Sequence, residues 1–332
     1  MAAGESQWID KIFNVSAAGF DELALEIFRY QYQQNPVYRK FVDALRVNPE
    51  NVVSLSHIPF LPIRFFKTED VKVAGDHELL FTSSGTTGLS TSRHMVRSGR
   101  LYEESFLRTF HVFYGAVSDW CVIGLLPSYL ERSGSSLVYM VDRLVRESGD
   151  HRSGFYLNAT DRLPALLEEL EREGKKTLLI GVSFALLDMA ETVDLHLHHT
   201  VIMETGGMKG RRTELVREEL HSILCGAFHV PVIHSEYGMT ELLSQAYSQG
   251  EGLFQCPSWM RIVARDEEDP LELRIDPQRT VTGALNVIDL ANVYSCSFIA
   301  TDDACRVHAD GRFEVIGRLD NSDLRGCSLL VL

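Results

Sequence analysis

Apolar and polar residues near the start of the chain recur with the period of an amphipathic helix. In residues 19–34, four apolar side chains share one face after an acidic first turn, and Asn35-Pro36 follows. This spacing predicts a helix over residues 19–34 and a second helix over residues 37–46. The apolar stretch 58–66 contains two prolines, which exclude a helix interior, so an extended segment packed on the core is predicted there.

Helical and strand-like segments then alternate along the chain. A helix is predicted over residues 101–111 and a buried strand over residues 120–126. After these, the pattern predicts helices over 161–172, 184–191 and 213–224, and strands over 177–180, 200–203 and 230–233. Such alternation is typical of a parallel sheet with right-handed crossovers, and therefore of an α/β fold.

From about residue 250 the pattern changes to short runs of β-rich character. Strands are predicted over 260–264, 271–275, 282–290, 297–301, 305–308 and 312–316. They favour a small antiparallel or barrel-like subdomain. We therefore expect an N-terminal helical and extended segment over residues 1–75, an α/β core over residues 76–250 and a β-rich part over residues 251–332.

Composition limits the classes of partner. The net charge is −14 and the apolar content 45%, which fits a folded enzyme-sized protein and argues against binding to nucleic acid or to anionic membranes. Six cysteines without a Cys-x-x-Cys pair predict reduced thiols in a cytoplasmic protein. The N-terminus lacks a signal-peptide pattern, and the longest apolar run, residues 177–190, is too short and too interrupted for membrane insertion.

A stretch rich in glycine and hydroxyl groups, Phe81-Thr82-Ser83-Ser84-Gly85-Thr86-Thr87-Gly88, follows an apolar pair. Glycines let several N–H groups converge on one anion, and the hydroxyls add donors, so the stretch is a candidate phosphate-binding loop. It lacks the spacing of a Walker A loop. A surface turn is the alternative, because the same residue types dominate turns.

Further candidate residues follow two predicted strands at the same edge of the sheet. Glu204-Thr205-Gly206-Gly207 follows one strand, and residues 234–241, with Glu236-Tyr237-Gly238-Met239-Thr240-Glu241, follow the next. They offer an aromatic ring for a base, a hydroxyl for a phosphate and a carboxylate for a cation. Thr301-Asp302-Asp303 could accept ribose hydroxyls, and Gly317-Arg318 carries a cation near the chain end.

These motifs, in this order, resemble those of the adenylate-forming enzymes, which include acyl-CoA synthetases and phenylacetate-CoA ligases. Thr82–Gly88 resembles their phosphate loop, Thr205-Gly206-Gly207 their adenine-side turn, and residues 236–241 their Tyr-Gly-x-Thr-Glu motif. Thr301–Asp303 resembles their ribose-binding motif and Gly317-Arg318-x-Asp320 their hinge motif. Within this superfamily, the amino-acid sequences of residues 20–28, 58–67 and 126–137 most resemble those of the acyl-protein synthetases (LuxE type) of fatty-acid reductase complexes.

The resemblance implies ATP-dependent activation of a carboxylic acid, expected to be a fatty acid, with Mg²⁺ as the metal. Its implied roles are phosphate binding by Ser83, Ser84, Gly85, Thr86, Thr87 and Gly88, and adenine binding by Gly206, Gly207, Glu236, Tyr237 and Gly238. Thr240 is expected to contact the α-phosphate, Glu241 to hold Mg²⁺, and Asp303 with Arg318 to hold the ribose.

Two departures from the family pattern bear on the second half of the reaction. Leu89-Ser90-Thr91-Ser92-Arg93 stands where relatives have Pro-Lys-Gly, and the sequence ends at Leu332, before the mobile C-terminal domain and its catalytic lysine. Arg93 is a candidate replacement cation. The expected acyl acceptor is the thiol of Cys327, from which a fatty acyl group would pass to a partner reductase or carrier protein; an inert buried thiol is the alternative.

The sequence alone leaves two other functions and a possible metal site open. Gly181-Val182-Ser183-Phe184-Ala185 looks superficially like the nucleophile elbow of a serine hydrolase, with Asp289 and His308 downstream, although Ser183 could instead cap a helix. A non-catalytic acyl- or nucleotide-binding protein is a third reading. His196-Leu197-His198-His199 could bind a metal or form an ordinary loop.

Overall fold

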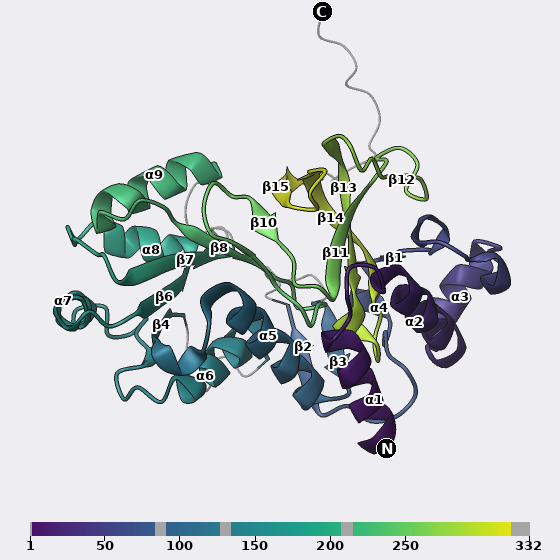
Figure 1. The fold of residues 1–332 in the computed structure, drawn as a ribbon, viewed down its shortest axis with the longest axis horizontal. Coiled ribbons are helices and arrows are strands. Elements are labelled where there is room, and N and C mark those ends of the chain that lie inside the picture. The colour runs from purple at the N-terminus through teal and green to yellow at the C-terminus, as the bar shows by residue number, and fades with distance from the viewer. Residues whose placement is uncertain (1, 84–90, 127–133, 207–214, 320–332) are drawn as a thin grey trace, which may run out of the picture.

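A computed structural model of the protein describes residues 2–83, 91–126, 134–206 and 215–319 (Figure 1). The first two predicted helices are confirmed as α2 (Phe20–Gln34) and α3 (Pro36–Ala44). The Asn35 side chain begins α3 by accepting hydrogen bonds from the N–H groups of Val37 and Tyr38. A helix that the sequence analysis did not predict, α1 (Ala2–Phe13), precedes them.

The predicted parallel sheet is confirmed. Its strands are β4 (Cys121–Leu125), β5 (Gly154–Phe155), β6 (Thr177–Val182), β7 (Thr200–Thr205) and β8 (His234–Tyr237), paired in the order β8-β7-β6-β4-β5. The helices are α5 (Gly99–Tyr114), α6 (Ser136–Ser148), α7 (Leu163–Glu173), α8 (Ser183–Ala190) and α9 (Arg217–Phe228). Figure 1 shows α5 and α6 on one side of these strands and α8 and α9 on the other. The strands are buried between the helices, as a parallel sheet requires.

Two predicted boundaries in this region are wrong. The strand expected over residues 230–233 lies at His234–Tyr237 instead, because Pro231 has no N–H for the ladder and Val232 is exposed. The helix expected over residues 213–224 begins at Arg217 and continues to Phe228, while residues 213 and 214 lie outside the described residues. Helix α6 was missed altogether; it begins after Ser135, whose hydroxyl accepts from the N–H of Val138.

The β-rich part of the chain pairs antiparallel, as predicted, and continues the same sheet. Strands β9 (Ala246–Ser248) and β10 (Phe254–Gln255) connect β8 to β15 (Phe313–Arg318). Beyond β15 the order is β14 (Phe298–Val307), β13 (Val281–Asp289), β11 (Met260–Arg265) and β12 (Leu273–Arg274). The two strands predicted over 297–301 and 305–308 form one continuous strand, β14, so Asp303 lies within a strand rather than in a turn.

The segment that the sequence predicted as extended is only partly so. Strand β1 (Leu61–Pro62) runs parallel to β14, and the N–H of Ile63 donates to the Ala300 carbonyl at 2.8 Å. The chain then turns into a short helix, α4 (Phe65–Thr68), because no proline follows Pro62 to prevent it. Short 3₁₀ turns at Pro49–Asn51, Leu55–His57, Val117–Asp119 and Leu290–Asn292 and the hairpin of β2 (Leu79–Thr82) with β3 (Arg93–Val96) complete the described elements.

Helix α2 is joined to the β-rich half by a buried side chain. The Nε2 of Gln31 donates to the carbonyls of Asn292 and Val293, each at 3.0 Å, and its Oε1 accepts from the N–H of Ser297 at 3.0 Å. Gln31 is fully buried. Since buried backbone groups need partners, this amide fixes the turn between β13 and β14.

Among the described residues, no helix combines the length and apolar character that a bilayer crossing requires.

This anchor generates a stability prediction. Replacing Gln31 by Leu would leave the Val293 carbonyl and the Ser297 N–H without these partners and the Asn292 carbonyl with the Ser295 N–H alone, so we expect Gln31→Leu to lower the free energy of unfolding by about 3 kcal/mol. Urea denaturation measures the change. Gln34→Leu, on the exposed face of the same helix, is the matched control and should change stability by less than about 0.5 kcal/mol. Equal effects of the two variants would contradict the role given to Gln31.

Candidate nucleotide and acid site

The ends of two parallel strands bring the first candidate residues together. In the β7–β8 ladder Thr205 is paired with Glu236, and the Thr205 hydroxyl donates to Oε2 of Glu236 at 2.5 Å. Both side chains are buried. Burial, with a smaller contribution from the charge of Glu204, raises the pKa of Glu236 to about 7 against the lowering effect of the Thr205 hydrogen bond.

Two glycines shape the backbone beside this pair. Gly206 has φ +67°, and among the described residues, its chain neighbours aside, no atom lies within 4 Å of the position that a Cβ would take, so a flat ring could approach the backbone there. Gly238 is different, because a Cβ on it would lie 2.4 Å from Oε1 of Glu236. A side chain at residue 238 would therefore displace the Glu236 carboxyl group.

Tyr237 links the parallel strands to the β-rich half. Its ring packs against Phe254 and Phe313 with centroids 6.0 and 5.7 Å away, and its hydroxyl donates to Oδ2 of Asp303 at 2.8 Å. Asp303 is paired in the β14–β15 ladder with Arg318, whose Nε lies 3.7 Å from Oδ1 of Asp303. Burial raises the pKa of Asp303, although the Tyr237 hydrogen bond acts in the opposite direction. Three of the predicted nucleotide residues thus lie together.

The Thr240-Glu241 segment is held from several sides. His94, fully buried on β3, contacts the Thr240 carbonyl through Nδ1 at 2.8 Å, and Asn292 donates from Nδ2 to the Glu241 carbonyl at 2.7 Å. Its Nε2 also faces an acceptor, Oδ1 of Asn292 at 3.1 Å, so a neutral ring can donate to only one of the two oxygens. Burial lowers the pKa of His94 to about 4, so the imidazole is neutral near pH 7.

The Glu241 carboxyl group is buried and close to the hairpin that bounds the glycine-rich stretch. The side chain of Ser92 hydrogen-bonds it, and the charges of Lys67 and Arg318 act on it from farther away. Burial is nevertheless the largest effect and raises the pKa of Glu241. A cation bound at this carboxylate would compensate for the cost of its burial.

A second buried carboxylate fixes the chain after Glu241. Asp289 accepts hydrogen bonds from the N–H groups of Leu243 and Ser244 at 2.7 and 3.0 Å, and from the Ser244 hydroxyl at 2.6 Å. Burial raises its pKa to about 6, against these bonds. Asp289 therefore acts as an anchor for the loop that carries Thr240 and Glu241, which the sequence did not indicate.

The two ends of the glycine-rich stretch are tied together. The N–H of Ser83 donates to the Ser92 carbonyl at 3.1 Å, the Ser83 hydroxyl accepts from the N–H of Ser92 at 2.9 Å, and the N–H of Thr82 donates to the Gly134 carbonyl at 2.8 Å. Arg93, the candidate replacement cation, instead pairs with Asp70 at 2.9 Å on the exposed side of the hairpin. Seven predicted site residues lie outside the described residues: Ser84, Gly85, Thr86, Thr87, Gly88, Gly207 and Cys327. Asp320 of the predicted hinge motif lies outside them as well.

Ser183, Asp289 and His308 do not form the catalytic triad of a serine hydrolase. Ser183 is the first residue of α8 and not its cap, and its hydroxyl donates to the Gly206 carbonyl at 2.8 Å. Asp289 binds the 243–244 backbone, and His308 contacts Glu314 at 2.9 Å. Asp289 and His308 also lie at opposite ends of the β13–β14 pair, about 25 Å apart at the rise of a strand. Ser183 instead supports the Gly206 turn.

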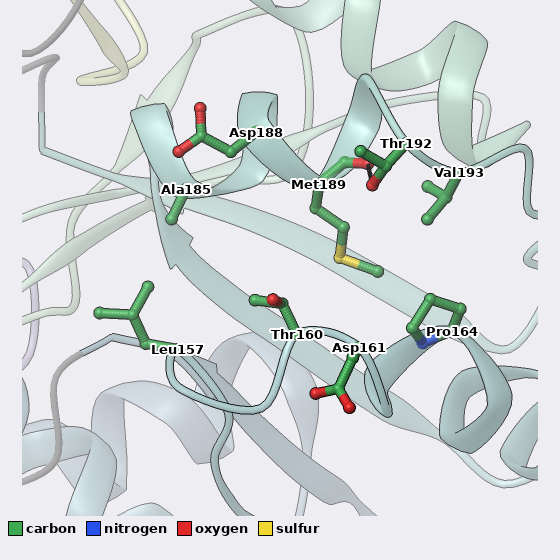
Figure 2. Close-up of a pocket in the computed structure, with 9 residues that line it drawn as sticks. All are labelled: Leu157, Thr160, Asp161, Pro164, Ala185, Asp188, Met189, Thr192 and Val193. Carbon is green, nitrogen blue, oxygen red and sulfur yellow. Dashed lines mark hydrogen bonds between the residues drawn. The ribbon is translucent and has the colours of Figure 1, made fainter.

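A pocket of about 430 Å³ lies between α8 and the segment that leads into α7. Figure 2 shows the Met189 side chain reaching from α8 toward Thr160 and Pro164. None of the motif residues lines this pocket. Its nine lining residues are Leu157, Thr160, Asp161, Pro164, Ala185, Asp188, Met189, Thr192 and Val193.

Several residues of the site gave no sequence signal. His94 and Asn292 are single polar residues outside any motif, Ser92 lies in the stretch that departs from the family's Pro-Lys-Gly, and Asp289 has only the sequence order of a hydrolase triad. Their contacts to Thr240, Glu241 and Ser244 span 45 or more residues of sequence. These residues are identified only by the contacts that the folded chain makes between β3, the end of β13, the 290–292 turn and residues 237–244.

The raised pKa of Glu236 predicts a pH dependence of stability. The folded protein binds this proton up to about pH 7, whereas the unfolded chain loses it near pH 4.5, so the free energy of unfolding falls as pH rises through that interval, by up to about 3 kcal/mol. Glu236→Gln cannot ionise and should flatten this part of the profile. Urea denaturation between pH 4.5 and 7.5 checks it, with Glu168→Gln on exposed α7 as control. An unchanged slope in Glu236→Gln would contradict the assignment.

Comparison with solved structures finds the same architecture in enzymes of low sequence identity. ATP-bound MatB from Rhodopseudomonas palustris aligns with TM-score 0.55 and 16% identity over 74% of this chain and 49% of its own. A 2-hydroxyisobutyryl-CoA ligase in complex with 2-HIB-AMP aligns with TM-score 0.63 and 11% identity over 94% of this chain and 70% of its own. A luciferase-like enzyme from the mealworm Zophobas morio aligns with TM-score 0.51 and 16% identity over 75% and 59%.

No family model matches the sequence, and no curated protein matches it either. The chain spans about half the length of the MatB structure. At these identities the likeness concerns the fold, and it confirms the fold class that the sequence predicted. The chain has a mixed α/β fold, with one large sheet of parallel and antiparallel strands, that it shares with these aligned enzymes.

Proposed function

We propose that this protein is an adenylate-forming ligase that activates a carboxylic acid with ATP. The observation that carries the proposal is the convergence of Gly206, Tyr237 and Asp303 with the Thr240-Glu241 segment around one end of the parallel strands. The structural neighbours support it, because MatB binds ATP and the 2-hydroxyisobutyryl-CoA ligase binds 2-HIB-AMP in the aligned structures. Ligands of α/β sheets commonly bind at the carboxyl ends of the strands.

The nucleoside part of ATP fits the described residues. The open space beside Gly206 would admit the adenine ring next to the backbone, and the Tyr237 ring would face it. Asp303, whose carboxyl group is held by the Tyr237 hydroxyl, would accept the ribose hydroxyls, with Arg318 beside it. In this proposal the stretch from Ser83 to Gly88 binds the phosphates through its N–H and hydroxyl groups.

Glu241 fits a magnesium ion. Its carboxylate is buried, is hydrogen-bonded by Ser92 and has no cation within ion-pair distance among the described residues. Oxygen ligands of this kind suit Mg²⁺. When bound there, the ion would neutralise phosphate charge, while His94 and Asn292 would keep the Thr240-Glu241 backbone in place.

The chemistry follows from these roles. A carboxylate oxygen of the acid attacks the α-phosphorus of ATP, the bond from this phosphorus to pyrophosphate breaks, and acyl-AMP and pyrophosphate result. The protein contributes alignment of the two substrates and hydrogen-bond donors for the phosphate oxygens. Thr240 would donate to the α-phosphate at this step.

We further propose that the acid is a fatty acid and that the acyl group passes to a protein thiol, as in the acyl-protein synthetases. The Cys327 thiolate would attack the acyl carbonyl and release AMP, and a partner reductase or carrier protein would then receive the acyl group. This part rests on the sequence resemblance alone, because Cys327 lies outside the described residues.

The first half-reaction has a direct assay. We expect acid-dependent exchange of labelled pyrophosphate into ATP when the full chain is supplied with a panel of carboxylic acids. Glu241→Gln should reduce the exchange rate by about 100-fold, because it removes the carboxylate proposed to hold the metal. Glu168→Gln, on the exposed face of α7, is the control and should exchange at the wild-type rate.

Two results would oppose the proposal. Absence of exchange with every acid would favour a non-catalytic nucleotide- or acyl-binding protein. Exchange that is equally fast in Glu241→Gln and in Glu168→Gln would remove Glu241 from the reaction. Covalent labelling of Ser183 by a fluorophosphonate would instead support a serine hydrolase.

The second half-reaction is tested by following a radiolabelled fatty acid into protein. Cys327→Ala should abolish the covalent acyl-enzyme and leave pyrophosphate exchange unchanged, since the adenylate forms before the thiol is used. Cys225→Ala, a partly buried thiol on α9, is the control and should retain labelling. Undiminished acyl-enzyme in Cys327→Ala would exclude Cys327 as the acceptor.

A further inference from the structure

The segment that leads into β7 is held rigidly against two helices. The N–H groups of Leu195 and Leu197 donate to the carbonyls of Ala227 and Phe228 at the end of α9, at 2.9 and 3.1 Å. On the other side, Glu171 of α7 accepts from the N–H groups of residues 198 and 199. Leu195 and Leu197 are buried, whereas Asp194 and His196 are exposed. The alternation therefore presents Asp194 and His196 on one outer face.

His229, the residue that follows α9, adds a third side chain to that face. His229 ends α9 with φ 49° and ψ 37°, which directs its side chain back toward the 194–197 segment. Its ring stacks on that of His196, with centroids 3.8 Å apart and planes inclined by 10°. Its Nε2 also lies 2.5 Å from Oδ1 of Asp194. Residues 33 positions apart in sequence are thus brought into one exposed cluster.

We propose that Asp194, His196 and His229 form a surface binding site for a divalent transition-metal ion, namely Zn²⁺. One ligand atom from each residue lies within 4.8 Å of the others. Two imidazole nitrogens and one carboxylate oxygen form a donor set that suits Zn²⁺ and leaves a fourth tetrahedral position for water. Binding would require the stacked rings of His196 and His229 to separate and turn one nitrogen each toward the ion, which their exposed side chains can do without a change of backbone.

This site is separate from the one proposed for Mg²⁺ and does not depend on the proposed function. It lies before Thr200, where β7 begins, whereas Gly206 follows the other end of that strand, about 20 Å away at the rise of a parallel strand. A bound ion would connect the 194–197 segment to the end of α9. Because it would bind the folded chain only, it should stabilise the fold without changing adenylation.

The test uses the full chain, freed of metal with a chelator that is then removed. We expect Zn²⁺ to bind with one-to-one stoichiometry in calorimetry and to raise the melting temperature, and Co²⁺ to give the visible absorption of a site with nitrogen and oxygen ligands. His196→Ala and His229→Ala should each weaken Zn²⁺ binding at least about 10-fold, a loss typical even of outer-shell changes. His198→Ala, exposed on the same segment, is the matched control and should bind as wild type.

Two results would overturn the proposal. One is no saturable binding of Zn²⁺ or Co²⁺ by the wild-type chain. The other is equal affinity of His196→Ala, His229→Ala and His198→Ala, which would assign the ion to other residues. Circular dichroism of each variant without metal verifies that a lost affinity does not reflect a lost fold. Pyrophosphate exchange should be unchanged in all three variants.

Discussion

The candidate site depends on how the carbonyl groups of Thr240 and Glu241 are held. His94 binds the first and Asn292 the second, and both side chains are fully buried. Asn292 belongs to the turn that Gln31 of α2 fixes from the opposite side. A chain of hydrogen bonds therefore runs from an N-terminal helix through the β-rich half to the residue proposed to hold the metal. A preorganised site of this kind needs no rearrangement when charge develops in the reaction.

The second requirement is that two differently built halves of the sheet meet at Tyr237. The parallel half supplies Gly206 and Glu236, and the antiparallel half supplies Asp303 and Arg318. The Tyr237 ring packs on Phe254 and Phe313, and its hydroxyl reaches Asp303. Because one residue makes both contacts, the nucleotide residues of the two halves keep a fixed relative position. This explains how motifs more than 60 residues apart could serve one ligand.

The sequence predicted helices and strands wherever local spacing determines them, as for α2, β6 and β7. It placed β8 four residues too early, because apolar content alone did not register the missing N–H of Pro231. It could not predict His94, Asn292 or Asp289, whose roles depend on contacts between distant segments. The sequence could not predict the cluster of His196 with His229 for the same reason, although His196 lies in a histidine-rich stretch.

The central claim is that the residues gathered around Tyr237 bind an acyl-adenylate. The most direct measurement is a crystal structure of the full chain with a non-hydrolysable acyl-sulfamoyl adenosine, an analogue of the proposed intermediate. The account predicts adenine beside Gly206 and Tyr237, ribose hydroxyls on Asp303, and the sulfamoyl group next to Thr240. An analogue that binds elsewhere, or that leaves the Asp303 carboxylate without a ribose contact, would contradict it.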